Sequence, residues 1–446
     1  MLRISSAASG EEVASLKVTD LEGAHTVGAL KRYLAKKHQY SRFQVRLFRE
    51  GDPSELQEHE VLTAPVELQL MLMSYLAPEV YRDQDFLDTC EQGELEDVER
   101  SLRALQNPNL DPADNWFDSP LGLAALQGHT DVVRLLLEAK ANSEWQNAKE
   151  RRMTALHYAA WATNLEVVRV LLEHSADQDA QNSSGESVLH CAASNGEPEI
   201  VRLLLNHGAE KEVMDVERRR PLHSAAFNGQ VEAARVLIDS GAEIEVTNLF
   251  KEQPLHSAAS TGSAEVTRLL LDAKANKEAT TSDGQGPLHL AAAVGCRGHC
   301  DTIRVLLDYG ADKEAVDRAG RRPLHLAAQP PSPTAAQLLL EAKADLEAMS
   351  PDGSRPLHYA AKHSLDVALL LLTARAELEA TTVDGYSPLH FAAEEGRLDL
   401  VRLLLEHGAK GHQEVKELLE GRKRRRFEWS ALQSGAQRLL RQLAAR

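Results

Sequence analysis

Apolar and polar positions along this chain repeat with a period close to 33 residues. Each period contains Leu-His, one spacer residue and Ala-Ala, followed by a stretch with apolar residues three and four positions apart, such as Val401, Leu404 and Leu405. That spacing places the apolar side chains on one face of a helix. We therefore expect two short helices in each period. The histidines of the Leu-His pairs are His157, His190, His223, His256, His289, His325, His358 and His390.

The spacing of these histidines is nearly constant, with steps of 33, 33, 33, 33, 36, 33 and 32 residues. A fixed period of this length indicates one supersecondary unit that is repeated and stacked, because a single unit cannot bury its apolar face alone. The expected product is a mainly α solenoid with a long continuous surface. Surfaces of that kind serve for binding.

The last full period shows the local signals best. Ser387 precedes Pro388, so a hydroxyl that can cap a helix is followed by a residue whose φ is already helical. Gly408 can take the left-handed conformation that ends the second helix. With the Leu-His and Ala-Ala pairs, the unit resembles the ankyrin repeat, which consists of two antiparallel helices and a hairpin-like loop. About ten units are expected: a degenerate first one around Phe86 to Gly93, and others that begin near Ser119, Thr154, Ser187, Arg220, Gln253, Gly286, Arg322, Arg355 and Ser387.

Several units depart from the ankyrin pattern. The family prefers Thr or Ser at the start of the first helix, but five units carry Arg220, Gln253, Gly286, Arg322 or Arg355 there. Except at the glycine, we expect each to forfeit about 1 kcal/mol of capping. In three other places Glu150, Arg218 and Lys251 replace the expected loop glycine. A residue other than glycine must take a positive φ there or reshape the loop.

The first 73 residues follow a different period. Apolar residues alternate in 43–47 and 66–72, which predicts half-buried strands. An opening strand pair and a helix with Val27, Leu30 and Leu34 on one face precede them. This order, together with segment 44–51, resembles the ubiquitin-like β-grasp fold. No Gly-Gly follows Leu72, so a conjugated tag is not expected. The predicted domains are 1–73 (ubiquitin-like β-grasp domain), 78–412 (ankyrin-repeat solenoid) and 413–446 (basic helical tail).

Charge is unevenly distributed along the chain. The formal net charge is −17; residues 1–73 carry −1 and residues 411–446 carry +5, which leaves −21 for 74–410. A surface that acidic repels nucleic-acid phosphates and anionic membranes. The tail holds one basic run, and two interpretations of it stay open: a nuclear import signal, or a solvated helix face against the acidic repeats. The run is Arg422, Lys423, Arg424, Arg425 and Arg426.

The expected compartment follows from what the sequence lacks. Four cysteines are too few for a disulfide scaffold, and no charged-then-apolar signal peptide opens the chain. The apolar stretches are far shorter than the roughly 18 residues that a membrane span needs. We expect a soluble protein of the cytoplasm, with the nucleus as the alternative.

Three sets of residues suggest chemistry. The histidines could form a metal ladder, but successive units lie about 10 Å apart. Two histidines from neighbouring units therefore cannot both lie at the bonding distance of roughly 2 Å from one zinc ion. The ankyrin resemblance implies instead that they bond neighbouring loop backbone. Cys296, His299 and Cys300 lie in the one unit that is longer by three residues, as either a partial zinc site or an ordinary insertion. The third set is a column of loop acids, either a cation-attracting edge or solvated and locally hydrogen-bonded groups: Glu144, Asp179, Glu212, Glu245, Glu278, Glu314, Glu347 and Glu379.

No motif for catalysis is present. The chain has no phosphate loop that ends in Lys-Ser/Thr, no Gly-x-Ser-x-Gly and no His-Glu-x-x-His. We expect neither an enzyme nor a bound metal or cofactor, and no small-molecule substrate, nucleic acid or membrane as partner. The expected function is a protein–protein adaptor or scaffold that binds through the concave face and loop tips of the repeats, with a second protein on the β-grasp domain. Two alternatives are a ubiquitin-pathway component, whose β-grasp domain docks on the proteasome or a ligase while the repeats carry a substrate, and a nuclear regulator that uses the basic tail.

The main partner site is expected in the first half of the repeats. In the ankyrin pattern the residue after Ala-Ala lies toward the concave groove, and large aromatic residues hold that position only early in the chain. Neighbouring loops add arginines and one more aromatic, a combination enriched at binding hot spots. The alternative is that the aromatics only cover neighbouring helices. The predicted partner-binding residues are Arg151, Arg152, Trp161, Arg218, Arg219, Phe227 and Phe250.

Overall fold

The computed structural model describes residues 2–7, 12–16, 25–38, 40–50, 52, 54–62, 66–75, 80–109, 119–146, 151–329 and 333–410. These residues fall into two compact units, Met1–Val213 and Met214–Arg446. The predicted tail, with its basic run, lies outside the described residues. The boundaries proposed at 73, 78 and 412 stay predictions.

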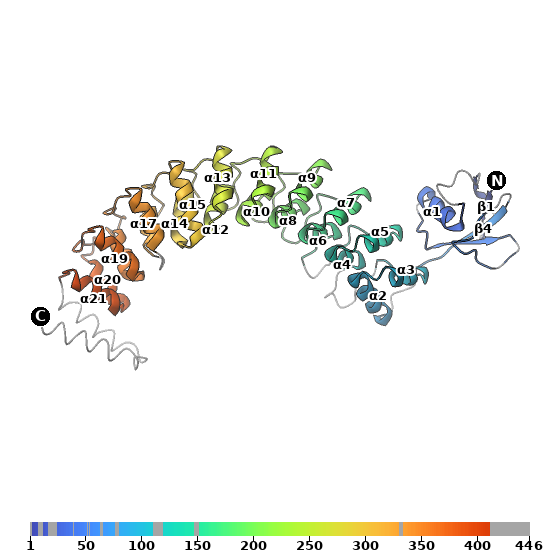
Figure 1. Ribbon diagram of the computed structural model, residues 1–446, viewed down its shortest axis with the longest axis horizontal. Helices are drawn as coiled ribbons and strands as arrows, with labels where there is room; N and C mark the ends of the chain where they lie inside the picture. The colour runs from blue at the N-terminus through green and yellow to red at the C-terminus, as the bar shows by residue number, and fades with distance from the viewer. Residues whose placement is uncertain are drawn as a thin grey trace. The chain divides into compact units, whose positions relative to one another are not determined.

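A small mixed sheet and one helix form the N-terminal part (Figure 1). The strands are β1 (Leu2–Ser6), β2 (Glu12–Leu16), β3 (Val45–Arg49) and β4 (Val66–Leu72), and the helix is α1 (Val27–His38). The strand order is β2-β1-β4-β3. β1 pairs antiparallel with β2 and parallel with β4, and β4 pairs antiparallel with β3. The predicted order of strand, strand, helix and strands is therefore confirmed.

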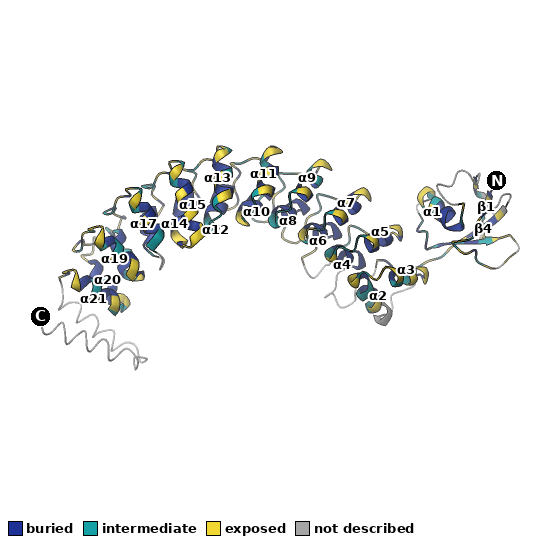
Figure 2. Cartoon of the chain, in the orientation of Figure 1, coloured by how far each residue is buried: buried dark blue, intermediate teal, exposed yellow. Residues whose placement is uncertain are grey.

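The alternation in the sequence decides which side of this sheet is buried. Val45 and Leu47 of β3, and Leu68 and Leu70 of β4, belong to one buried cluster. Residues two apart in a strand point to the same face, so both strands turn one apolar face to the core. From α1, the three residues with helical spacing, Val27, Leu30 and Leu34, complete that core. Figure 2 shows the buried stripe of α1.

Ten helix pairs follow among the described residues, in agreement with the predicted number of units. The unit Met1–Val213 holds α2 (Val80–Gln92) and α3 (Leu95–Arg103), α4 (Pro120–Gln127) and α5 (Thr130–Glu138), α6 (Ala155–Trp161) and α7 (Leu165–Glu173), and α8 (Val188–Asn195) and α9 (Pro198–Asn206). Within this unit α4 packs against α6 and α5 against α7, so first helices and second helices form two layers.

The unit Met214–Arg446 holds the other six pairs. They are α10 (Pro221–Phe227) and α11 (Val231–Asp239), α12 (Pro254–Thr261) and α13 (Ala264–Asp272), α14 (Pro287–Val294) and α15 (Arg297–Asp308), α16 (Pro323–Ala327) and α17 (Pro333–Glu341), α18 (Pro356–His363) and α19 (Leu365–Thr373), and α20 (Pro388–Glu395) and α21 (Leu398–Glu406). The three-residue insertion in the sequence is absorbed by α15, which has 12 residues where α13 has 9.

The Ala-Ala pairs explain the close packing of successive first helices. Ala258 and Ala259 of α12, and Ala291 and Ala292 of α14, are completely buried. Their methyl groups fill little space, so the backbones of neighbouring helices can approach each other. Gly408, expected to end the last second helix, has a φ of +98°, as the left-handed conformation requires.

Candidate protein-binding surface

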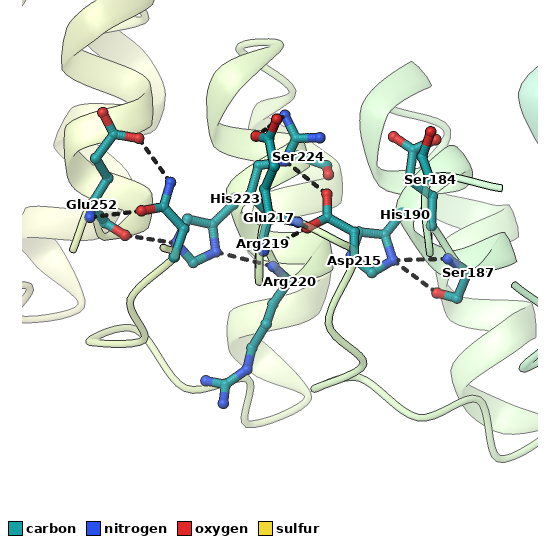
Figure 3. A network of polar contacts seen from close by, with 12 residues as sticks. Ser184, Ser187, His190, Asp215, Glu217, Arg219, Arg220, His223, Ser224 and Glu252 are labelled. Carbon is teal, nitrogen blue, oxygen red and sulfur yellow. Dashed lines mark hydrogen bonds and ion pairs between the residues drawn. The ribbon is translucent and has the colours of Figure 1, made fainter. Parts of the chain in front are cut away.

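Each repeat histidine occupies the third position of a first helix and bonds backbone atoms. In α6, Nδ1 of His157 accepts the N–H of Thr154 at 3.2 Å, and Nε2 lies 3.2 Å from the carbonyl oxygen of Glu186 in the following loop. Since Nδ1 is an acceptor, the ring proton is on Nε2, which donates to that carbonyl. The Nδ1 contact recurs at His190, His223, His256, His289, His325, His358 and His390. Figure 3 shows it at His190 and His223.

The same contacts lie in the interior of the repeats. Seven of the eight are buried. Both ring nitrogens of His256 are in use, with Nε2 at 2.9 Å from the carbonyl oxygen of Ala279. The described residues contain no group of three or more His, Cys, Asp or Glu side chains that could hold a metal ion.

Burial changes the acid–base behaviour of the same rings. It lowers the pKa of His157 and of His256 to about 4, although hydrogen bonds to backbone carbonyls act in the opposite direction. Burial also lowers the pKa of His289, His325 and His358. The neutral ring is thus the form that fits between the loops.

The column of loop acids is hydrogen-bonded within the repeats. One carboxylate oxygen of Glu314 accepts the backbone N–H of Asp345 in the next loop at 2.8 Å, and Glu245 accepts that of Asn276 at 2.7 Å. The same contact to the next loop is made by Glu144, Asp179, Glu278, Glu347 and Glu379. Of the two interpretations, local hydrogen bonding is the one that the structure has.

Arginines at helix starts take part in the same column. Nη1 of Arg322 lies 2.7 Å from Oε2 of Glu314 and 3.1 Å from Oδ2 of Asp345. Arg355 bridges Glu347 and Glu377 in the same way. Each arginine therefore holds the carboxylates of two successive loops together.

Arg322 gives its helix no side-chain cap, as expected, but its guanidinium has another role. The backbone N–H of Arg322 donates to Nδ1 of His325 at 3.0 Å, and the N–H of His325 donates to the carbonyl of Arg322 at 2.9 Å. The groups that a Ser or Thr hydroxyl would serve thus find other partners. The guanidinium is left to bridge the acids, which a hydroxyl is too short to do.

We expect Arg322→Ala to lower the free energy of unfolding by about 1 kcal/mol, because it releases the half-buried carboxylate of Glu314 and the exposed one of Asp345 from their shared cation. Arg304→Ala is the matched control, since Arg304 pairs with Asp301 on the exposed surface of one helix; it should cost less than about 0.5 kcal/mol. Urea unfolding of both variants measures the difference. Equal losses would show that the bridge adds nothing to an ordinary surface pair.

The hairpin-like loop before a first helix is called a finger below, and from α8 onward each finger holds a buried polar residue. In finger 214–219, Oδ1 of Asp215 accepts the N–H groups of Glu217 and Arg219 at 2.9 and 2.7 Å, and Oδ2 pairs with Nε of Arg219 at 2.7 Å (Figure 3). Asn248 holds finger 247–252 by accepting the N–H of Glu252 at 2.9 Å. The residues on either side of Asp215 and Asn248 point outward.

Three fingers carry residues other than glycine in the left-handed conformation. Arg218 and Lys251 have φ values of +60° and +58°, as predicted for positions that replace the loop glycine. In the earlier finger Arg152 has a positive φ, of +52°, two residues before the helix start, whereas we expected Glu150 to hold this position. The unit that begins near Ser119 is two residues longer than the period, so counting from its start places the position too early. Glu150 itself lies outside the described residues.

The predicted partner-binding residues fall on both units. Trp161 ends α6 in the unit Met1–Val213, with 49% of its surface exposed, and the exposed Arg151 and Arg152 precede that helix. Phe227 ends α10 in the unit Met214–Arg446, with 55% exposed. Both aromatics are therefore available at the surface of their own unit. That they serve one partner stays a prediction.

The loop members of that set differ in what they can offer. Phe250 and Arg218 are exposed at finger tips. Arg219, in contrast, is engaged with the buried Asp215, so its guanidinium belongs to the finger itself. Of the predicted loop residues in the unit Met214–Arg446, only Arg218 and Phe250 are thus suited to contact a partner.

Comparison with known families agrees with this architecture. The family model that matches describes three consecutive ankyrin repeats. It matches five overlapping segments of the chain, at residues 87–182, 175–248, 243–317, 293–383 and 324–415. These overlapping matches cover well over half of the chain. The chain belongs to the ankyrin-repeat family. Among solved structures, that of the human ASB11 ankyrin repeat domain is similar to this ankyrin-repeat chain, with 26% identity over 51% of this chain and 99% of that one, and a TM-score of 0.46. No curated protein matches the chain.

Sequence reasoning missed exposed apolar residues on two of the ankyrin fingers. Met214 and Val216 lie on finger 214–219, and Leu249 lies beside Phe250 on finger 247–252; all are exposed. Each of the three stands next to a buried polar residue, Asp215 or Asn248, that anchors the finger. The sequence shows these residues side by side, but only the structure shows which of them is buried.

The segment from Cys296 to Cys300 is an insertion that packs on the preceding ankyrin repeat. Nε2 of His299 lies 2.9 Å from the carbonyl oxygen of Ser260, and the ring is buried. Cys300 is buried as well, whereas Cys296 is exposed. The insertion interpretation is therefore the one that the structure favours. In the described part of the chain no helix is long and apolar enough to cross a membrane.

Proposed function

We propose that this ankyrin-repeat protein is a non-enzymatic adaptor or scaffold that binds a protein partner through its repeats. The observation that carries the proposal is the exposure of Trp161 and Phe227 at the ends of α6 and α10, where most first helices end in small or polar residues. The histidines and the loop acids are occupied in joining the repeats. What the repeats leave for a partner is therefore a stable surface with large aromatic side chains, which are enriched among hot-spot residues.

The double variant Trp161→Ala/Phe227→Ala should weaken binding of a co-purifying protein by about 2 kcal/mol or more, because buried aromatic anchors carry much of the energy of an interface. Calorimetric titration of the full chain measures the affinity. The matched control is Leu365→Ala/Leu369→Ala, which removes two exposed apolar side chains from the second-helix layer at α19. A loss of affinity that is the same for both variants, or none for the aromatic pair, would contradict the proposal. Circular dichroism checks that both variants remain folded.

The N-terminal sheet supports a second candidate function. Its order β2-β1-β4-β3, with β1 and β4 parallel and α1 on one face, agrees with a ubiquitin-like β-grasp domain. We propose that this domain binds a second protein, and that a link to the proteasome or a ligase is the form to test first. The face opposite α1 carries Arg46 and Phe48 from β3 and Gln69 and Met71 from β4, which lie across from one another in the sheet.

Phe48→Ala/Met71→Ala in the full chain tests that candidate. Co-purification followed by mass spectrometry should show proteasome or ligase subunits with the natural chain and a clear loss with the variant. Their retention by the variant would exclude this face as the contact. The nuclear alternative depends on Arg422–Arg426, which lie outside the described residues.

A further inference from the structure

Two neighbouring fingers of the unit Met214–Arg446 form an apolar platform, called the twin-finger surface below. Its apolar side chains have exposed fractions of 43% (Met214), 63% (Val216), 54% (Leu249) and 53% (Phe250). The fingers lie side by side, because the backbone N–H of Leu249 donates to the carbonyl of Glu217 at 3.0 Å. Large apolar side chains that are grouped and exposed in this way mark interaction sites.

Hydrogen bonds hold the backbone of the twin-finger surface in place. Asp215 and Asn248, each within two residues of these side chains, are buried and fixed by hydrogen bonds to their own finger. On the far side, the N–H of Ser282 donates to the carbonyl of Phe250 at 2.7 Å, which ties the platform to the next finger. A partner would therefore meet an ordered surface and lose little entropy in ordering it.

The twin-finger surface is less acidic than the repeats around it, because its two fingers carry three acidic and three basic side chains. Arg218 and Lys251 are both exposed, and neither forms an ion pair with another described residue. The acids of the two fingers themselves are already used: Asp215 and Glu217 pair with Arg219, and Glu252 accepts the side-chain amide of Asn248 at 2.8 Å. The platform thus presents two available cations in a region of the chain whose net charge is strongly negative.

We propose that the twin-finger surface binds a segment of a protein partner that is acidic and carries apolar side chains. Apolar anchors on the segment would cover Val216, Leu249 and Phe250, and carboxylates beside them would pair with Arg218 and Lys251. A basic segment would leave these two cations facing like charges, so the arrangement selects by sign as well as by apolar contact. This inference rests on the proposed function, since it names the kind of partner that one part of the repeats accepts.

Synthetic peptides test the proposal on the full chain. The probe is a fluorescent peptide in which Glu alternates with pairs of Leu; the comparison peptides replace each Glu by Lys, or each Leu by Ser. We expect the acidic apolar peptide to bind, and both comparison peptides to bind about tenfold more weakly or worse. Fluorescence anisotropy gives the affinities. Equal binding of the Lys peptide, or no binding of the acidic apolar peptide, would overturn the proposal.

Charge reversal locates the binding. Arg218→Glu/Lys251→Glu should lower the affinity of the chain for the acidic apolar peptide by about tenfold. The matched control is Lys274→Glu/Lys343→Glu, which makes the same change of charge at two exposed lysines that also have positive φ, +72° and +62°, but lie after second helices; it should change the affinity less than about twofold. The twin-finger assignment fails if the control variant lowers the peptide affinity as much as Arg218→Glu/Lys251→Glu does. It also fails if Trp161→Ala/Phe227→Ala is the only variant that lowers this affinity. In both cases the proposed protein-binding function stands. If neither aromatic residue matters to a natural partner but the peptide results hold, the proposed aromatic site fails and the twin-finger surface stands.

Discussion

Acidification from neutral pH to about pH 5 should destabilise the repeats strongly. His157 and His256 have folded-state pKa values of about 4, below the ordinary histidine value of 6.5. In the unfolded chain the same rings bind a proton as the pH falls through about 6.5, whereas the folded protein resists protonation until about pH 4. The stability from the neutral rings is therefore fully present above about pH 6.5 and is lost between there and about pH 4. By linkage, each ring costs about 2 kcal/mol at pH 5.

His289, His325 and His358 add to the loss, because their pKa values are lowered in the same direction. Urea unfolding at several pH values between about 7.5 and 5 measures the effect and stays above the range in which most carboxylates titrate. His157→Gln/His256→Gln is the control: the amide keeps a donor and an acceptor but does not titrate there. Its stability should be lower at neutral pH and depend less steeply on pH. A natural protein equally stable across this range would contradict the assignment of the buried neutral rings.

Asp317→Ala should cost about 3 kcal/mol of unfolding free energy, the largest loss that we expect from one side chain of a finger. The carboxylate is 1% exposed; it accepts the N–H of Arg321 at 2.8 Å and pairs with Nη2 of Arg321 at 2.8 Å. Removing it leaves a buried N–H without its acceptor and releases the guanidinium. The carbonyl of Arg321 also accepts Nε2 of His289 at 3.2 Å, so the damage extends to the preceding repeat.

The matched control for Asp317 is Thr281→Ala. Thr281 holds the same place in the neighbouring finger, and its hydroxyl accepts the N–H groups of Asp283 and Gln285 at 3.3 and 3.2 Å without an ion pair. Thr281→Ala should lower the free energy of unfolding by about 1 kcal/mol. Chemical unfolding of the two variants compares them directly. If Thr281→Ala cost as much as Asp317→Ala, the buried ion pair would contribute nothing beyond the finger's hydrogen bonds.

The repeated core could be predicted from the sequence because its causes are local and periodic. The spacing of His256 and His289, and the Ala-Ala pairs two positions after them, fix where first helices begin and how closely they pack. The positive φ of Arg218 and Lys251 was equally predictable, since the position is defined by its distance from the next helix start. Arg152 was missed because the preceding unit is two residues longer than the period. The distance from the start of that unit gives the wrong residue, whereas the distance to the next helix start gives Arg152.

The bridging arginines could not be predicted from helix-capping preferences. Those preferences consider only the first turn of a helix, whereas Arg322 reaches Glu314 eight residues before it and Asp345 in the next loop. The twin-finger surface needed the structure too. Only the inward position of Asp215 and Asn248 shows that Val216 and Leu249 must face solvent.

Hydroxyl-radical footprinting of the full chain, free and bound to a co-purifying protein, tests the protein-binding account most directly. Exposed Trp and Phe side chains are readily labelled in the free chain. The account predicts that labelling of Trp161 and Phe227 falls on binding, while labelling of Leu365 and Leu369 on α19 does not change. Unchanged labelling at both aromatics, with protection confined to the second-helix layer, would contradict it.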